Sequence, residues 1–298
     1  MEHEFDELRA IFTNQYLKKV KVTGNRDSYL KEMIDFINGH TGSNSKSDSQ
    51  QAATVSIIID ILNMFISMIN SADDDSREDV QKNLGDLGLL ESSINLLENP
   101  HPDIVKKSLQ MLNKLFEGGN KFIQEHLLRI FEGATDGEFF AQVRNRLLNA
   151  TNELRNVRRQ SDSNGTGDSD QAEEVELQDE ETSDFGLSVL TLLQLICQGQ
   201  FLKMKDFFRE QQRYTRSFNI VQDVAEFAFK IEKAFSFYLD NKMSPSANLK
   251  DEQDKAVLNT SKIFVDLTTQ IFATLTEIAS ACPPNIVNFP WNFLISRV

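Results

Sequence analysis

The sequence predicts an all-α fold, an armadillo- or HEAT-like α-solenoid of helix pairs that a disordered acidic linker interrupts. Apolar residues recur at helical spacing in runs joined by short polar breaks, and no stretch shows the alternation typical of a strand. Only 13 glycines and 6 prolines occur among 298 residues, too few for the frequent turns of an all-β fold. Hydrophobic residues make up 40% of the chain, which is enough for a sizeable core. The repeat is too degenerate to give a period, so a non-repeating helical bundle stays open.

The chain is predicted to divide at an acidic tract. Gln160–Asp184 holds ten acidic residues, no Lys or Arg and almost no apolar side chain, so it cannot bury enough surface to offset the entropy of ordering. We therefore expect a first helical part at residues 1–157, a disordered acidic linker at 158–184 and a second helical part at 185–298. The tract accounts for most of the net charge of −14, and a pI near 4.8 argues against nucleic-acid binding.

Helix boundaries follow from local signals. Pro102 suits the first turn of a helix, Gly118 suits the end of that helix, and Asn120 can cap the next one. Thr135 and Glu138 form the pattern T-x-x-E of a capping box. The predicted helices before the linker are 2–22, 27–38, 51–70, 77–84, 87–98, 102–117, 121–131 and 136–157. Those after it are 185–198, 201–212, 219–240, 251–280 and, between proline breaks, 285–296.

The sequence predicts no enzyme and no cofactor. It contains no G-x-S-x-G, P-loop, H-E-x-x-H or C-x-x-C pattern. The four histidines are far apart in sequence, and we interpret them as solvated surface residues: His3, His40, His101 and His126. Cys197 and Cys282 lie in apolar helical contexts and are predicted to be buried thiols in a reducing compartment.

No stretch is predicted to enter a membrane. The N-terminus is acidic where a signal peptide would be basic. The most apolar segment, Ala53–Ile69, includes Asp60 and Asn63, which would be costly in hydrocarbon. We therefore expect a buried core helix there.

One segment of the acidic tract has the spacing of an EF-hand calcium loop. Asp162–Glu173 places oxygen-bearing side chains at loop positions 1, 3, 5, 9 and 12 and a glycine at position 6. These are Asp162, Asn164, Thr166, Gly167, Asp170 and Glu173. Against a calcium site, position 8 is polar, the exiting helix is poor and no second loop follows. We assign no metal site and interpret the segment as a solvated linker, because a low-complexity tract of Asp, Ser, Gly and Asn produces such matches by chance.

Several segments resemble, in order and spacing, the intracellular calcium-release channels, which are the inositol trisphosphate and ryanodine receptors. They are Val80–Leu97, Leu115–Gln124 (LFEGGNKFIQ), Phe139–Arg155 (FFAQVRNRLLNATNELR), Leu190–Gln211, Ser217–Tyr238 and Thr274–Asn285. The residues that carry the shared motifs are Gly118, Gly119, Asn120, Gln124, Phe139, Phe140, Arg146, Leu193, Gln194, Leu195, Cys197, Phe208, Arg209, Leu275, Thr276, Glu277 and Cys282.

The resemblance implies an armadillo-like solenoid that consists of the receptor homology region and its associated domain. It would lie at the cytosolic face of the endoplasmic reticulum or of a related calcium-store membrane. The resemblance also implies a non-catalytic segment that transmits conformational change toward a pore. Its partners would be other domains or subunits of a larger, homotetrameric channel. We expect this segment neither to bind nucleic acid nor to insert into the membrane. The alternative is a free-standing cytoplasmic adaptor that binds a partner helix or peptide. Gly118 and Gly119 would form either a hinge or a fixed turn.

Overall fold

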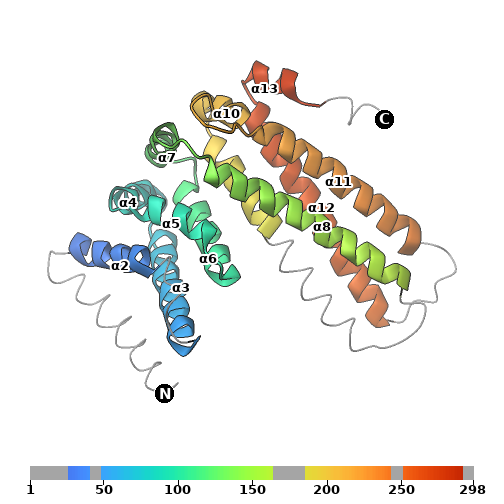
Figure 1. Cartoon of the computed structure of the whole chain (residues 1–298), viewed down its shortest axis with the longest axis horizontal. Helices are drawn as coiled ribbons and strands as arrows, with labels where there is room; N and C mark the ends of the chain where they lie inside the picture. Colours follow the sequence, from blue (N-terminus) through green and yellow to red (C-terminus); the bar gives the residue numbers. More distant parts are fainter. Residues whose placement is uncertain (1–25, 41–47, 164–184, 243–250, 291–298) are drawn as a thin grey trace.

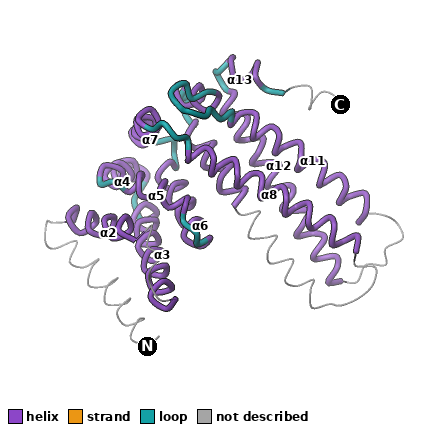
Figure 2. The backbone as a smooth tube through the Cα atoms, in the orientation of Figure 1, coloured by secondary structure: helices purple, strands orange, loops and turns teal. Residues whose placement is uncertain are grey.

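The computed structural model describes residues 26–40, 48–163, 185–242 and 251–290. Side chains are described for 27–40, 51–150, 185–236 and 261–290. Throughout these ranges the chain consists of helices and connecting loops without a strand, which confirms the all-α prediction (Figure 2). The predicted helix 2–22, nearly all of the EF-hand-like loop and residues 291–296 lie outside the described residues.

The helices agree with prediction in type and, mostly, in extent. They are α2 (Arg26–His40), α3 (Asp48–Asn70), α4 (Asp74–Asp86), α5 (Leu89–Asn95) with the 3-10 turn η1 (Leu96–Glu98), α6 (Pro102–Phe116), α7 (Lys121–Gly133), α8 (Glu138–Ser163), the helix Phe185–Cys197, α10 (Leu202–Arg209), α11 (Ile220–Lys242), α12 (Asp251–Ala279) and α13 (Pro283–Asn288). The last helix starts earlier than predicted, because Pro283 and Pro284 fit the first turn, where no N–H partner is needed.

Two capping predictions are confirmed and one is wrong. Pro102 opens α6, and Asn120 accepts hydrogen bonds from the N–H groups of the second and third residues of α7. The capping box does not form. Thr135 instead accepts a hydrogen bond through its carbonyl from the N–H of Thr215, and the Glu138 N–H at the start of α8 donates to Asp136. The loop between α7 and α8 is therefore held by a distant segment.

Helices α2–α7 form one group, coloured blue to green in Figure 1. Their central contact is α3 on α6. By length and composition alone, residues Gln51–Asn70 of α3 could cross a membrane. Within the protein, however, Leu62 and Phe65 are buried, while Ser56, Asn63 and Ser67 form an exposed polar ridge. Polar side chains on the outer ridge suit a protein helix at a water-facing surface.

The second group is a bundle of long helices. Helices α8, α11 and α12 lie side by side, and α10 and α13 sit near one end of this bundle (Figure 1). α8 continues to Ser163, past the predicted start of the linker at residue 158, and α11 follows the acidic tract, yet the two helices pack directly on each other. The two groups meet at the helix Phe185–Cys197, hereafter the 185–197 helix.

Candidate coupling interface

The glycine pair after α6 makes a tight turn that lies against the 185–197 helix end. Gly118 and Gly119 have φ values of +86° and +72°, which L side chains rarely adopt. The Gly119 N–H bonds back to the carbonyl of Phe116 at 3.0 Å. A Cβ on Gly119 would come within 3.3 Å of Cγ of Gln198. The pair thus forms a tight turn at a close contact between the two groups.

Asn120 and Gln81 form a buried amide pair behind this turn. The Nδ2 group of Asn120 donates to the Gln81 side-chain oxygen at 2.9 Å and to the Glu78 carbonyl at 3.0 Å. Nε2 of Gln81 donates to the carbonyls of Lys114 at 2.8 Å and Glu117 at 2.9 Å. These carbonyls close α6 and have no partner within that helix. The pair therefore fastens α4, α6 and α7 together.

Gln124 repeats this arrangement across the junction. Its side chain is 1% exposed, and Nε2 donates to the carbonyls of Leu195 at 3.1 Å and Gln198 at 2.9 Å, at the end of the 185–197 helix. Gln81 and Gln124 lie about 43 residues apart, a spacing within the armadillo and HEAT range. Each glutamine caps the C-terminal end of a helix that packs against its own.

Further hydrogen bonds hold the 185–197 helix on both sides. From α6, Asn113 Nδ2 donates to the Ser188 carbonyl at 3.2 Å. From α12, the Thr274 hydroxyl donates to the Leu190 carbonyl at 2.9 Å, and Gln270 donates to the Gln194 side chain at 2.7 Å. The helix therefore accepts side-chain hydrogen bonds from α6 and α7 and also from α12.

The apolar motif residues of this helix lie in the core. Leu193 and Cys197 are fully buried, and Leu195 packs against the core. Burial raises the pKa of the Cys197 thiol far above its ordinary value, so this thiol is an inert core group. The prediction of buried cysteines is confirmed, because Cys282 is 3% exposed and both thiols are free.

Phe139 and Phe140 anchor the start of α8 in an aromatic cluster. Phe140 is fully buried, with its ring centroid 5.0 Å from that of Phe131, 5.9 Å from Phe207 and 6.0 Å from Phe208. Phe139 packs edge-on against it at 5.3 Å. This cluster joins α7 and α8, which precede the acidic tract, to α10, which follows it.

Arg146 makes a second connection from α8. Its Nη2 donates to the Leu97 carbonyl of η1 at 2.5 Å, and the guanidinium lies 5.7 Å from the centroid of the Phe185 ring. Burial lowers the pKa of Arg146, but an arginine retains its charge at neutral pH. One side chain thereby links α8, η1 and the start of the 185–197 helix.

Further motif residues surround an ion pair between α10 and α12, in which the lysine is fully buried and the carboxylate of Glu277 is 24% exposed. Lys205 is fully buried, and its Nζ lies 3.1 Å from Oε1 of Glu277 and 3.0 Å from the Ser280 carbonyl. Arg209 donates to the Asn285 oxygen at 2.8 Å, while Asn285 Nδ2 donates to the Lys205 carbonyl at 3.0 Å. These polar groups lock α10 against the turn between α12 and α13.

The other predicted motif residues have plain positions. Phe208 and Leu275 belong to the core, Thr276 is exposed, and Cys282 places its Sγ 3.9 Å from a carboxylate oxygen of Asp206. Sequence reasoning missed Gln81, Lys205 and Asn285 as key residues. All three lie within the segments that carry the family resemblance, but no local pattern marks a residue that bonds to a distant helix end.

The histidine prediction needs correction at three positions. Nε2 of His126 lies 2.8 Å from Oε1 of Glu91, and this side chain is 21% exposed. Nε2 of His101 lies 3.1 Å from the side-chain nitrogen of Gln51. Nδ1 of His40 lies 2.8 Å from the Phe36 carbonyl oxygen, and the two rings stack with their centroids 4.1 Å apart. His101 and His126 have partners because helix packing brings polar groups to them, and His40 bonds within its own helix. Among the described residues, no group of three or more His, Cys, Asp or Glu side chains could hold a metal ion.

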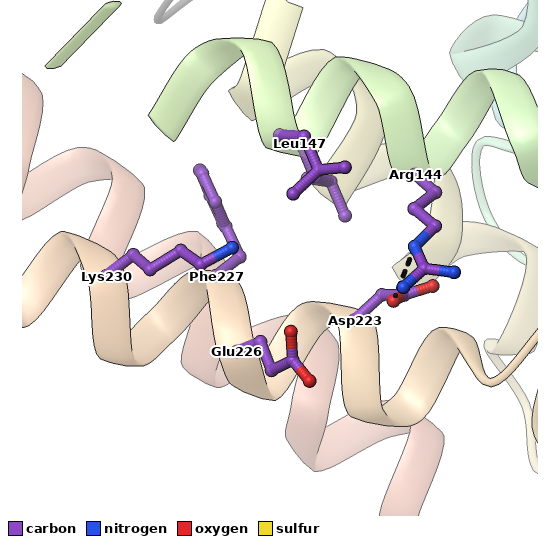
Figure 3. Close-up of a pocket in the computed structure, with 7 residues that line it drawn as sticks. Arg144, Leu147, Asp223, Glu226, Phe227 and Lys230 are labelled. Carbon is purple, nitrogen blue, oxygen red and sulfur yellow. Dashed lines mark ion pairs between the residues drawn. The ribbon is translucent and has the colours of Figure 1, made fainter. Parts of the chain in front are cut away.

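A small open pocket lies between α8 and α11 (Figure 3). Arg144 Nε and Asp223 Oδ1 are 3.2 Å apart at one side, and Glu226 and Lys230 lie along α11 beside them (Figure 3). The second carboxylate oxygen of Asp223 is buried without a hydrogen-bond partner. Burial raises the pKa of Asp223 to about 6, although Arg144 acts in the opposite direction.

A comparison with known families matches the region after the acidic tract. Residues 180–288 match the family described as RyR and IP3R Homology associated, and they make up a little over a third of the chain. The match includes the 185–197 helix, α10, α11, α12 and α13. The resemblance to the calcium-release channels is confirmed over this range. Over residues 180–288 the chain is therefore similar to the RyR and IP3R Homology associated family.

Proposed function

We propose that this chain is a non-catalytic regulatory segment of an intracellular ligand-gated calcium-release channel, and that it transmits conformational change toward the pore. The observation that carries the proposal is the position of the 185–197 helix. This helix lies inside the family-matched region, and buried side chains hold it from both directions: Gln124 from α7 and Thr274 from α12.

The proposed mechanism is rigid transmission through packed helices. Coupling needs a continuous set of contacts whose arrangement both ends influence. A displacement of α4–α7 would pull on the carbonyls that Gln124 caps, and the 185–197 helix would carry it to α12 through Thr274. Hydrogen bonds of Asn120 and Gln124 hold the chain just after the glycine pair. This favours a fixed turn over a hinge at Gly118–Gly119.

The same proposal includes the partners and the location. The segment would contact other domains or subunits of a larger channel, a homotetramer, on the cytosolic face of a calcium-store membrane. The alternative is that the same fold serves as a free-standing adaptor that binds a partner helix or peptide. Several large apolar side chains in the described ranges are exposed, among them Val287 at 79% and Phe272 at 53%, and these suit packing against a further protein surface in either case.

The test is the size and location of the native polypeptide. An antibody against this chain would be used on total lysate and on membrane fractions of the source cells. The channel proposal expects a membrane-bound polypeptide of several hundred kilodaltons, and depletion of it should reduce ligand-evoked calcium release. A soluble band near 34.0 kDa with unchanged calcium release would refute the channel assignment and favour the adaptor.

A further inference from the structure

The long helices of the protein form a row in which each helix contacts the next. α6 contacts both α3 and the 185–197 helix, and the 185–197 helix in turn contacts both α6 and α12. Side chains make the later contacts, because Asn113 of α6 donates to the Ser188 carbonyl and Thr274 of α12 donates to the Leu190 carbonyl. α12 is the last member of this row within the described residues.

The side of α12 that faces away from the row is exposed. Gln270 and Thr274 face the 185–197 helix, and α11 covers a second side of α12. At about 100° per residue, Val265 and Phe272 lie nearly half a turn around the helix from Gln270 and Thr274. Their side chains are 52% and 53% exposed, so the described part of the chain leaves this third side of α12 open to solvent.

This exposed side, hereafter the outer face of α12, carries little charge. Its exposed positions from residue 265 to residue 280 are Val265, Asp266, Thr269, Phe272, Thr276 and Ser280. Only Asp266 among them is ionisable. A threonine hydroxyl can bond to a carbonyl of its own helix, which leaves the methyl group available for packing. The outer face therefore suits contact with apolar side chains better than contact with water.

The following short helix ends in a similar way. Asn285 of α13 is buried and donates to the Lys205 carbonyl of α10. Val287, two residues further on, lies on the opposite side of α13 and is 79% exposed. Both helices thus present apolar side chains on the side that faces away from the preceding helix of the fold.

A further protein helix is the occupant that this arrangement favours. In a helical solenoid each unit packs on its neighbours, and a terminal unit that meets water carries a polar outer face. The outer face of α12 lacks that polar character, so it suits continuation of the row by another helix. A second copy of this chain is a poor match, because the exposed ridge of α3 at the other end of the row is polar, with Ser56, Asn63 and Ser67.

We propose that the outer face of α12, together with Val287 of α13, is a docking surface for an amphipathic α-helix of a neighbouring domain. That helix lies along α12 and packs an uncharged apolar stripe on Phe272 and Val265. The neighbouring domain would be part of the same channel, so the docking surface rests on the proposed function and names the kind of partner it requires.

Site-specific photo-crosslinking in source cells tests the contact. The photoreactive residue p-benzoylphenylalanine would replace Phe272 or Val265 in the native gene, so that the complete protein is present. The matched control places it at Gln222, an exposed polar residue of α11. Mass spectrometry would then identify the cross-linked peptides and the residue at which each is joined.

The proposal expects the Phe272 position to cross-link roughly tenfold more than the Gln222 position, because a partner would surround the ring. The Val265 position should label the same partner helix about seven residues away, since the two positions are two turns apart on α12. Yields no higher than at Gln222, or joined sites that lie on lipid, on a second copy or within residues 1–298 of the same molecule, would overturn it. The cross-link reports the contact whatever calcium release does, so its failure leaves the channel proposal standing.

A charge placed on the outer face gives an independent measurement. Phe272→Glu should abolish the cross-link from position 265, and Gln222→Glu should leave that cross-link unchanged. In the purified chain Phe272→Glu should change the melting temperature by less than about 2 °C, because the side chain is exposed. A larger fall would show that Phe272 packs within the chain, and it would contradict a docking role for this face.

Discussion

Replacing Gln124 by methionine removes the two hydrogen bonds that cap the 185–197 helix and leaves the side-chain length nearly unchanged. The carbonyls of Leu195 and Gln198 would lose their buried donor. An unsatisfied buried acceptor costs about 1–3 kcal/mol, and the helix end can recover part of this by relaxing toward water. We therefore expect the free energy of unfolding to fall by about 2–4 kcal/mol.

The assay is urea unfolding of the full chain followed by circular dichroism, with Gln142→Met as the control. Gln142 also carries an amide on a helix, but its hydrogen bond to Glu138 lies at the exposed surface, so its replacement should change stability by less than about 0.5 kcal/mol. In the Gln124→Met chain, backbone amide hydrogen exchange should become faster in the 185–197 helix before it becomes faster in α3. A Gln124→Met chain as stable as the control would refute the idea that this amide fastens the two helical groups.

Three further predictions concern the turn at Gly119, the pocket beside Asp223 and the ion pair between Lys205 and Glu277. Gly119→Ala should lower the melting temperature by several degrees, because the φ of Gly119 is +72° and the added Cβ meets Gln198. The control Gly133→Ala should not lower the melting temperature, because Gly133 lies in a helix with open space around it. Equal melting curves for the two variants would contradict the turn geometry. Burial raises the pKa of Asp223 to about 6, so its contribution to stability is complete below pH 4 and is lost as the pH rises through 6. In urea unfolding measured from pH 4 to pH 8, the Asp223→Asn chain should therefore gain stability relative to the native chain. A stability difference that stays constant over this range would count against the raised pKa. Lys205→Met should destabilise the chain by about 1–3 kcal/mol, because the Ser280 carbonyl and the partly exposed Glu277 carboxylate both lose their donor. Adding Glu277→Leu should restore part of the loss. Additive losses would show that the two charges do not act as a pair.

The helices themselves could be predicted from the sequence, because they depend on local signals. Apolar spacing located α6 and α7, and Pro102 and Asn120 marked their starts. Where a local signal competes with a distant contact, the prediction failed. Thr135 has the sequence of a capping residue, but the chain there is fixed by a backbone hydrogen bond to Thr215.

The interface could be predicted only in part. The family motif identified Gln124 and Asn120 as candidate residues. The sequence around them does not show which distant groups their side chains bond to. Gln81 is the clearest example, because its partners Lys114 and Glu117 lie more than thirty residues away. The packing of α8 on α11 across the acidic tract is likewise a long-range property that helical periodicity does not encode.

The most direct test of the coupling account is calcium release from stores of source cells that carry Gln124→Met in the native gene, with Gln142→Met cells as the matched control. Release would be evoked by inositol trisphosphate and by ryanodine at equal protein abundance and store content. The account predicts a weaker or right-shifted response in the Gln124→Met cells alone, because the loosened junction transmits less of the movement. Identical responses in both lines, with faster hydrogen exchange verified in the 185–197 helix of the Gln124→Met chain, would contradict it.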